Sequence, residues 1–218
     1  GQGLYFPKHF EELEDVPGLL RQSFVPRSVA VLQHLVGEEI GADTVERMVT
    51  SAFDFPISAP ALPGADGRAR ALELFHGPSL AFKDFGARFM ARLMAWLTRG
   101  DDRELSVLVA TSGDTGGAVA SAFHNVPGTR VVILYPQGKV SGLQEKQLTA
   151  LGGNITALEI DGSFDDCQTL VKAAFLDRAL SESLNLTSAN SINLARLVPQ
   201  IFYYIHAAGG LPAGVKPV

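Results

Sequence analysis

Short apolar runs alternate with longer helical patterns in the second half of this sequence, and the alternation limits the folds open to it. The runs at 105–110, 130–135 and 155–160 have the length of single strands. The first run, "LSVLVA", lacks a regular polar alternation, which is typical of a strand covered on both faces. A helical pattern follows each run, as in units that place parallel strands side by side. We therefore predict an α/β fold with a parallel sheet and flanking helices.

The helices of this half are predicted from the spacing of apolar residues. We expect them over 142–151 and 164–180, with one more that ends near His206. Pro199 lies inside the last pattern, and proline cannot donate the backbone hydrogen bond that a helix interior needs. We therefore expect a kink or an irregular first turn there.

The first 70 residues predict helices and irregular structure. Apolar residues at helical spacing predict one helix that ends at Gly37 and a second around 40–49. The stretch 55–70 is rich in Pro, Gly and Ala and predicts a loop. Residues 71–75 then predict a short strand. A helix is predicted next from the apolar stripe of Phe85, Phe89, Leu93, Trp96 and Leu97.

Composition narrows the classes of function. Hydrophobic residues make up 46% of the 218 residues and charged residues 19%, so the chain can bury a core. The net charge is −5 and no run of Lys or Arg occurs, which argues against a nucleic-acid partner. The apolar runs are too short to span a membrane, and the five histidines show no metal-ligand spacing. With Cys167 as its one cysteine, the chain fits a reducing cytoplasm, and we interpret Cys167 as a packing residue.

The stretch "SLAFKDFGARF" places Lys83 in an apolar setting where a helix begins. The start of a helix and partial burial both disfavour an ammonium ion, so both favour the neutral amine that forms a Schiff base. Asp84 then lies in the first turn, where a negative charge suits the helix end. A surface lysine extending from a helix start is the alternative, and a bare "FKD" would favour it.

The stretch "LVATSGDTGGAVA" leads from a buried strand through a glycine-rich turn into a helix. Small residues let backbone N–H groups approach a ligand, and the helix start favours an anion. The turn follows the carboxyl end of a strand, where open α/β sheets bind ligands. It matches neither G-x-G-x-x-G nor a Walker loop. A tight turn without a ligand is the alternative, and the hydroxyls of Thr111, Ser112 and Thr115 make it less attractive.

A third stretch, "SANSINLARL", combines possible helix caps with a basic residue. Asn190, Ser191 and Asn193 are all residue types that cap helices. Arg196 lies about one turn further on and could bind a phosphate through two hydrogen bonds. From the spacing alone, capping plus a solvated arginine is the better interpretation.

Together these stretches resemble the threonine synthase family of pyridoxal-phosphate enzymes, which has the tryptophan-synthase-β fold (fold type II). The stretches "GLYFPK", "LELFHGPSLAFKDFGARFMA", "ATSGDTGGAVASAF", "VVILYPQGK", "LGGNI" and "NSINLARLVPQIFYY" occur in order over essentially the whole chain. The resemblance implies a cytoplasmic lyase of threonine biosynthesis, a monomer or homodimer. It would convert O-phospho-L-homoserine and water to L-threonine and phosphate.

The resemblance also implies roles for single residues. Lys83 would hold the pyridoxal 5'-phosphate as a Schiff base and then move protons on the substrate. Phe82 would pack beside the cofactor ring, and Asp114 falls where many relatives carry an asparagine that faces the ring oxygen. The substrate's carboxylate or phosphate would be bound by Thr111, Ser112 and Thr115. Its phosphate would also be bound by Ser191 and Arg196.

The resemblance implies an organisation in three parts: a helical and irregular region at 1–70, a smaller mobile lobe at 71–150, and from 151–218 the start of a larger cofactor-binding lobe. In the family, a glycine-rich loop for the cofactor phosphate follows a strand that would begin near Pro217. The sequence starts at Gly1 without a methionine, so we expect a fragment. Two alternatives stay open: a serine or threonine dehydratase-like lyase of the same fold, and an inactive fragment or paralogue that only binds ligands or partners.

Overall fold

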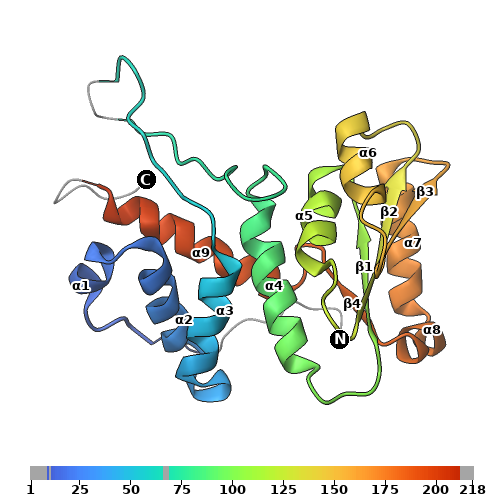
Figure 1. Ribbon diagram of the computed structural model, residues 1–218, viewed down its shortest axis with the longest axis horizontal. Coiled ribbons are helices and arrows are strands. Elements are labelled where there is room, and N and C mark those ends of the chain that lie inside the picture. Colours follow the sequence, from blue (N-terminus) through green and yellow to red (C-terminus); the bar gives the residue numbers. More distant parts are fainter. Residues whose placement is uncertain (1–8, 10, 66–68, 212–218) are drawn as a thin grey trace.

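The computed structural model describes residues 9, 11–65 and 69–211, and it shows a helical group beside an α/β unit (Figure 1). The long helix α4 (Lys83–Leu97) runs between the two parts. Because α4 begins with Lys83, the contact between the two parts positions that residue. The strand expected near Pro217 lies outside the described residues.

The α/β unit is built on a parallel sheet, which confirms the predicted fold class. Its strands are β1 (Leu105–Ala110), β2 (Thr129–Pro136), β3 (Ile155–Ile160) and β4 (Leu186–Ser188). They lie in the order β3-β2-β1-β4, and every neighbouring pair is parallel. All six residues of β1 are buried, as its apolar run predicted.

Helices cover both faces of this sheet. Apolar residues of α4 and α5 (Asp114–Phe123) share a core cluster with Val107, Val131 and Ile133, while α6 (Gly142–Thr149) adds Leu148. On the opposite face, α7 (Phe164–Leu176) packs against alternate residues of the same strands. Cys167 of α7 is buried in that second cluster, and burial raises the pKa of its thiol, which agrees with a packing role.

The helical group contains the N-terminal helices and the last one. These are α1 (Val16–Arg21), α2 (Phe24–Ile40), α3 (Ala42–Ala52) and α9 (Leu194–Gly209). They enclose a cluster of aromatic rings to which α4 also contributes. The rings, with centroids 5.4 to 6.3 Å apart, belong to Phe24, Phe53, Phe85, Phe89 and Phe202.

A buried arginine joins both ends of the helical group. The Arg27 guanidinium donates hydrogen bonds to the carbonyl oxygens of Leu19 (3.1 Å) and Leu20 (2.7 Å), where α1 ends. Its Nη1 lies 3.0 Å from Nδ1 of His206 on α9. Burial, with the Arg27 charge as a second cause, lowers the pKa of His206. The folded chain therefore favours a neutral imidazole that accepts a hydrogen bond from Arg27.

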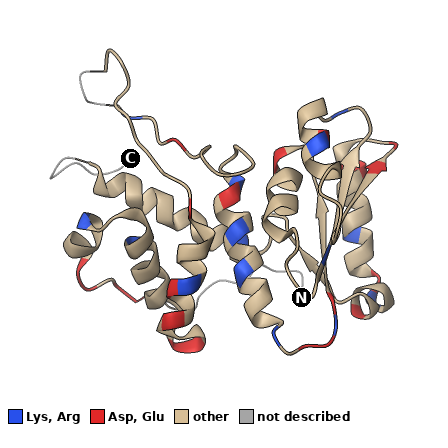
Figure 2. Ribbon diagram, viewed as in Figure 1, with Lys and Arg blue, Asp and Glu red and all other residues tan. Residues whose placement is uncertain are grey.

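Basic residues gather along α4 in Figure 2 and tie this helix to the end of α3. Arg88 donates from Nε to the carbonyl oxygen of Ala52 at 2.7 Å, and Arg92 donates to that of Ser51 at 3.0 Å. Arg88 also pairs with Asp54 at 2.7 Å. These arginines satisfy carbonyl groups that a helix end leaves without partners.

Two predicted elements differ from the structure. Residues 71–75 form no strand, because only the single bridges Ser58↔Glu73 and Ala61↔Arg70 pair this region. The helix predicted over 164–180 ends at Leu176, where Asp177 leaves the helical conformation and caps α8 (Arg178–Ser183) through its side chain. The stop expected at Gly37 corresponds to a kink: Val36 leaves the helical conformation directly before it, and a short helical continuation then runs to Ile40.

Pro199 does not interrupt α9, which runs unbroken from Leu194 to Gly209. The predicted cap of α9 is confirmed for Asn193, whose side chain accepts a hydrogen bond from the backbone N–H of Ala195 at 2.9 Å. The kink expected at Pro199 is therefore absent from this described helix.

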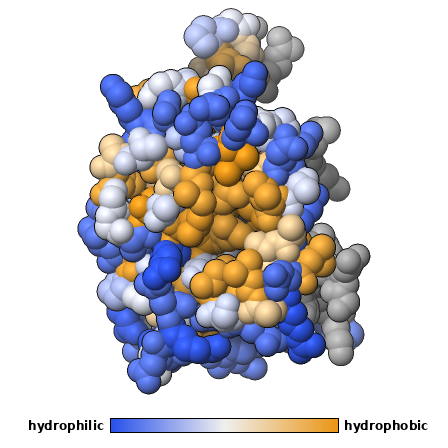
Figure 3. All heavy atoms as spheres, turned by 90° about the vertical axis from the view of Figure 1, so that its right-hand side faces the viewer, coloured by the Kyte–Doolittle hydropathy of each residue, from blue (hydrophilic) through white to orange (hydrophobic). Residues whose placement is uncertain are grey.

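The side of the molecule that carries β3 and α7 shows a large apolar area in Figure 3. β3 is an edge strand, and α7 contacts β1 and β2. Leu158 of β3 and Leu170 of α7 are accordingly exposed. Within the described ranges, no helix is long and apolar enough to cross a membrane, and no cluster of three His, Cys, Asp or Glu residues could hold a metal ion.

Candidate active site

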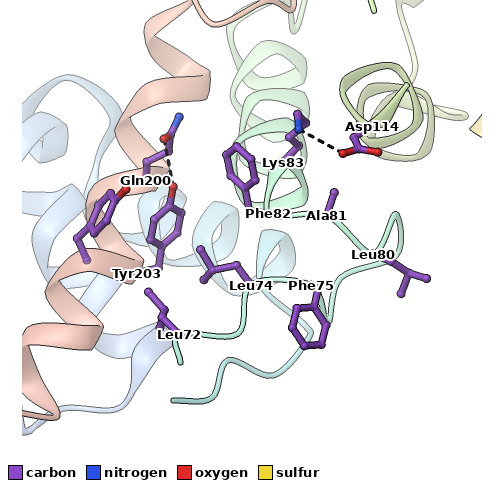
Figure 4. Close-up of a pocket in the computed structure, with 11 residues that line it drawn as sticks. Leu72, Leu74, Phe75, Leu80, Ala81, Phe82, Lys83, Asp114, Gln200 and Tyr203 are labelled. Carbon is purple, nitrogen blue, oxygen red and sulfur yellow. Dashed lines mark hydrogen bonds and ion pairs between the residues drawn. The ribbon is translucent and has the colours of Figure 1, made fainter. Parts of the chain in front are cut away.

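A pocket of about 570 Å³ opens where α4 begins, between the segment 72–82, α5 and α9 (Figure 4). Most of its lining is apolar or aromatic. The lining residues are Leu72, Leu74, Phe75, Leu80, Ala81, Phe82, Lys83, Asp114, Gln200, Tyr203 and Tyr204. Three of the predicted site residues, Phe82, Lys83 and Asp114, therefore share one cavity.

Lys83 points toward the glycine-rich turn rather than into bulk water. Its side chain is 22% exposed, and Nζ lies 3.5 Å from Oδ2 of Asp114. The same nitrogen lies 4.6 Å from the centroid of the Phe82 ring. The Asp114 carboxylate and the Phe82 ring therefore hold the Lys83 amine in a fixed place at the pocket wall.

The segment before Lys83 is held by the buried carboxyl of Asp84. Its Oδ2 accepts a hydrogen bond from the backbone N–H of Ser79 at 2.8 Å, and burial raises its pKa. Only glycine fits at position 77, because a Cβ there would lie 2.4 Å from Oδ2 of Asp84. Leu80 adopts a positive φ of 58° within this segment. Asp84 thus folds the segment that places Leu80 and Phe82 on the pocket wall.

Thr111 holds the glycine-rich turn together from inside. It is buried, and its hydroxyl oxygen accepts hydrogen bonds from the backbone N–H groups of Gly113 (3.0 Å) and Gly116 (2.8 Å). The hydroxyl donates in turn to the carbonyl oxygen of Gly113 at 3.1 Å. Ser112 is exposed and Thr115 is partly exposed. The Thr111 hydroxyl is therefore occupied, whereas the other two residues remain accessible.

Asp114 is held from a second direction by Gln144, which sequence reasoning missed. Nε2 of Gln144 donates to Oδ1 of Asp114 at 2.7 Å. The only signal in the sequence is the pattern S-x-x-Q from Ser141, which predicts a capping box but no contact 30 residues away.

The polar residues contributed by α9 to the pocket were also missed. Tyr203 donates from its hydroxyl to Oε1 of Gln200 at 3.1 Å, as Figure 4 shows. Burial raises the pKa of Tyr203 to about 12, so this phenol remains a donor at neutral pH.

Ser191 lies just before α9 and Arg196 lies in the first turn of that helix, and both are outside the pocket lining. Arg196 is buried, donates from Nη1 to the carbonyl oxygen of Ala189 at 2.6 Å, and has an Nε without a partner among the described residues. Burial lowers its pKa. Ser191 is exposed. Asn190 bonds both backbone groups of Ala110, which brings this segment to the end of β1, directly before the glycine-rich turn.

A family model and similar curated sequences assign this chain to the same kind of protein. The family model described as "Pyridoxal-phosphate dependent enzyme" matches residues 68–215. Threonine synthases of Serratia marcescens and Escherichia coli (strain K12) are 51% and 50% identical over 213 residues, or 97% of this chain. These matches cover 48% and 49% of the relatives, so the chain spans about half the length of the curated relatives it matches.

Solved structures agree. The crystal structure of threonine synthase from Escherichia coli superposes with a TM-score of 0.88 at 48% identity, over 97% of this chain and 49% of that one. The structure of PLP-bound threonine synthase from Brucella melitensis gives 0.86 at 39% identity, over 99% and 48%.

The pocket fits the aldehyde and ring of pyridoxal phosphate. An amine faces a cavity whose walls are mostly apolar, next to an aromatic side chain. Lys83 is the one basic residue among the described lining residues. The lining thus offers an amine for the aldehyde and an aromatic side chain for the ring, whereas the phosphate of the cofactor would need donors other than the pocket lining.

Proposed function

Because the chain belongs to the family of pyridoxal-phosphate dependent enzymes, we propose that it acts as a threonine synthase. This lyase reaction converts O-phospho-L-homoserine and water to L-threonine and phosphate. The observation that carries the proposal is the Lys83 amine, held between Asp114 and the Phe82 ring in a mostly apolar pocket. The names of relatives that are about half identical over nearly the whole chain support it.

Lys83 is the residue to which the cofactor binds, and Phe82 and Asp114 hold the surroundings of that bond. When bound, pyridoxal phosphate draws electrons away from the amino-bearing carbon of the substrate. The Lys83 amine, once free, takes and returns protons at this carbon and its neighbours. Asp114, 3.5 Å from Nζ, keeps the amine directed at the pocket.

The glycine-rich turn supplies the contacts to the substrate's negative groups. Ser112 and Thr115 are accessible at the start of α5, where backbone N–H groups favour an anion. Thr111 acts by holding the turn, since its own hydroxyl is engaged there. These residues bind the carboxylate or phosphate of the substrate.

Arg196 and Ser191 bind the substrate phosphate. The buried Nε of Arg196 without a described partner supports this role, because a buried cationic group is costly unless it meets an acceptor. The connection through Asn190 places this segment beside the turn. We predict that Arg196→Ala raises KM for the phosphorylated substrate more than it lowers kcat.

The test compares two products from the purified protein with added pyridoxal phosphate. Phosphate released from O-phospho-L-homoserine, with threonine formed in equal amount, supports the proposal. Ammonia released from threonine or serine without phosphate release would instead identify a dehydratase-like lyase. Neither product, with ligand binding retained, would identify an inactive binding protein. Lys83→Ala is the control that must abolish turnover.

We also propose a cytoplasmic location, a monomeric or homodimeric state, and a smaller lobe at 71–150 that closes on substrate. The boundary of this lobe at residue 150 falls within one sheet, because β3 and β4, which follow that residue, pair with β2 and β1. Hydrogen exchange with and without substrate tests the lobe: closure predicts protection across 71–150, and protection confined to the pocket would contradict it.

A further inference from the structure

The side chain of Gln144 is held at both ends. It lies in the first turn of α6, where Oε1 accepts hydrogen bonds from the backbone N–H and the hydroxyl of Ser141 at 3.1 and 3.0 Å. Its Nε2 donates to Oδ1 of Asp114 at 2.7 Å. An amide fixed in this way presents its donor in one direction, toward Asp114.

Gly113 leaves the space for this contact. A Cβ at position 113 would lie 2.4 Å from Nε2 of Gln144, and the φ of this residue is +142°, where side chains are strained. The glycine therefore serves the turn in two ways: it adopts a backbone conformation that other residues avoid, and it lets the Gln144 amide reach Asp114.

The Asp114 carboxylate needs a second partner to keep one oxygen oriented toward the Lys83 amine. Its side chain is 51% exposed, so water competes for both oxygens, and an exposed ion pair gains little by itself. A carboxylate whose Oδ1 accepts from a fixed amide has its other oxygen directed, and that oxygen is the one 3.5 Å from Nζ of Lys83.

We propose that Gln144 is a positioning residue that fixes the Asp114 carboxylate against the Lys83 amine, a role that rests on the proposed function of Lys83. Gln144 touches Lys83 only through Asp114. The bridge also links the first turn of α6, through Asp114 of α5, to the first residue of α4. A shift of α6 would therefore reach the reactive amine.

The main variant is Gln144→Met, which keeps the length of the side chain and removes the amide. Ser141→Ala is the control for the helix cap, because it removes one of the two donors to Oε1 of Gln144 and leaves the backbone donor of Ser141 and the amide donor to Asp114 in place. Gln144→Asn, shorter by one methylene, retains an amide that falls short of Asp114. It serves as a second variant if Gln144→Met does not fold, which circular dichroism reports.

The readout is the rate at which acetic anhydride acetylates Lys83 at fixed pH in protein without cofactor. Peptide mass spectrometry follows it, with exposed Lys172 as the internal reference. Because an amine engaged by a carboxylate is less available to the reagent, Gln144→Met should raise the relative rate about two- to fivefold, the range that an exposed ion pair allows. Asp114→Ala should raise it at least as much, and Ser141→Ala should change it less than about 1.5-fold.

The double variant decides whether Gln144 acts through Asp114. In the D114A background, Gln144→Met should add no further change, since the carboxylate it positions is gone. A Lys83 rate that is unchanged by Gln144→Met while Asp114→Ala raises it overturns the proposal, as does an equal effect of Gln144→Met with and without Asp114. Because this labelling needs no turnover, a protein that makes no threonine but shows the expected rates would refute the proposed function and leave the positioning role intact.

Discussion

Gly86 lets α4 and α9 come into backbone contact, and we predict that Gly86→Ala pushes these helices apart. A Cβ at this position would lie 2.7 Å from the carbonyl oxygen of Arg196, about 0.7 Å short of ordinary contact. The atom it meets belongs to the backbone, so no side chain can swing away. Overpacking of this kind costs about 1–3 kcal/mol, and alanine recovers about 1 kcal/mol through helix propensity. Taking the upper half of the overpacking range, we expect a net loss of about 1–2 kcal/mol in the free energy of unfolding.

Urea unfolding followed by circular dichroism measures this loss, and the melting temperature should fall by about 2–8 °C. Gly142→Ala is the control, because a Cβ at that helical position meets nothing within 4 Å and should cost less than about 0.5 kcal/mol. A Gly86→Ala protein as stable as the parent would refute the argument that the two helices touch through their backbones. The result bears on function, since α4 begins at Lys83 and α9 carries Gln200 and Tyr203.

Three further predictions concern buried or half-buried polar groups. Thr111→Val leaves two buried N–H groups of the turn unpaired and should cost about 2–4 kcal/mol by urea unfolding, whereas Thr169→Val at an exposed site should cost less than about 0.5. Burial raises the pKa of Asp84, so stability is lost as pH rises through its folded pKa. The advantage of Asp84→Asn in unfolding free energy should therefore grow between pH 4 and 7, and a constant difference would contradict the argument. The pKa of His206 is lowered below 6.5, so its contribution is present above that pH and is lost as pH falls. His206→Gln should flatten the loss of stability below about pH 6.5.

Three strands of the sheet were predictable because they carry their signal locally, whereas the short β4 was missed. The runs at 105–110 and 155–160 coincide with β1 and β3, since unbroken or nearly unbroken apolar residues bounded by turns leave few alternatives. The helix that begins at Lys83 was also predictable, from its apolar stripe that includes Phe85 and Phe89. In contrast, 71–75 has the composition of a strand but lacks a continuous partner, and partners cannot be read from a single segment.

The site was predictable in its reactive residue and less so in its supports. Lys83 and Asp114 were identified, and the structure brings them together. The Thr111 hydroxyl was expected to face a ligand. In the structure its oxygen instead accepts hydrogen bonds from two backbone N–H groups of the turn. Gln144 was missed because its partner is 30 residues away and its local pattern is that of a helix cap.

The most direct test of the central claim is to reduce the cofactor-treated protein with borohydride and map the modified peptide. Attachment of the cofactor to the Lys83 amine predicts a phosphopyridoxyl group on this residue, and none in Lys83→Ala. A group attached to a different lysine, or none in protein that is shown to be folded, would contradict the claim that this amine binds the cofactor.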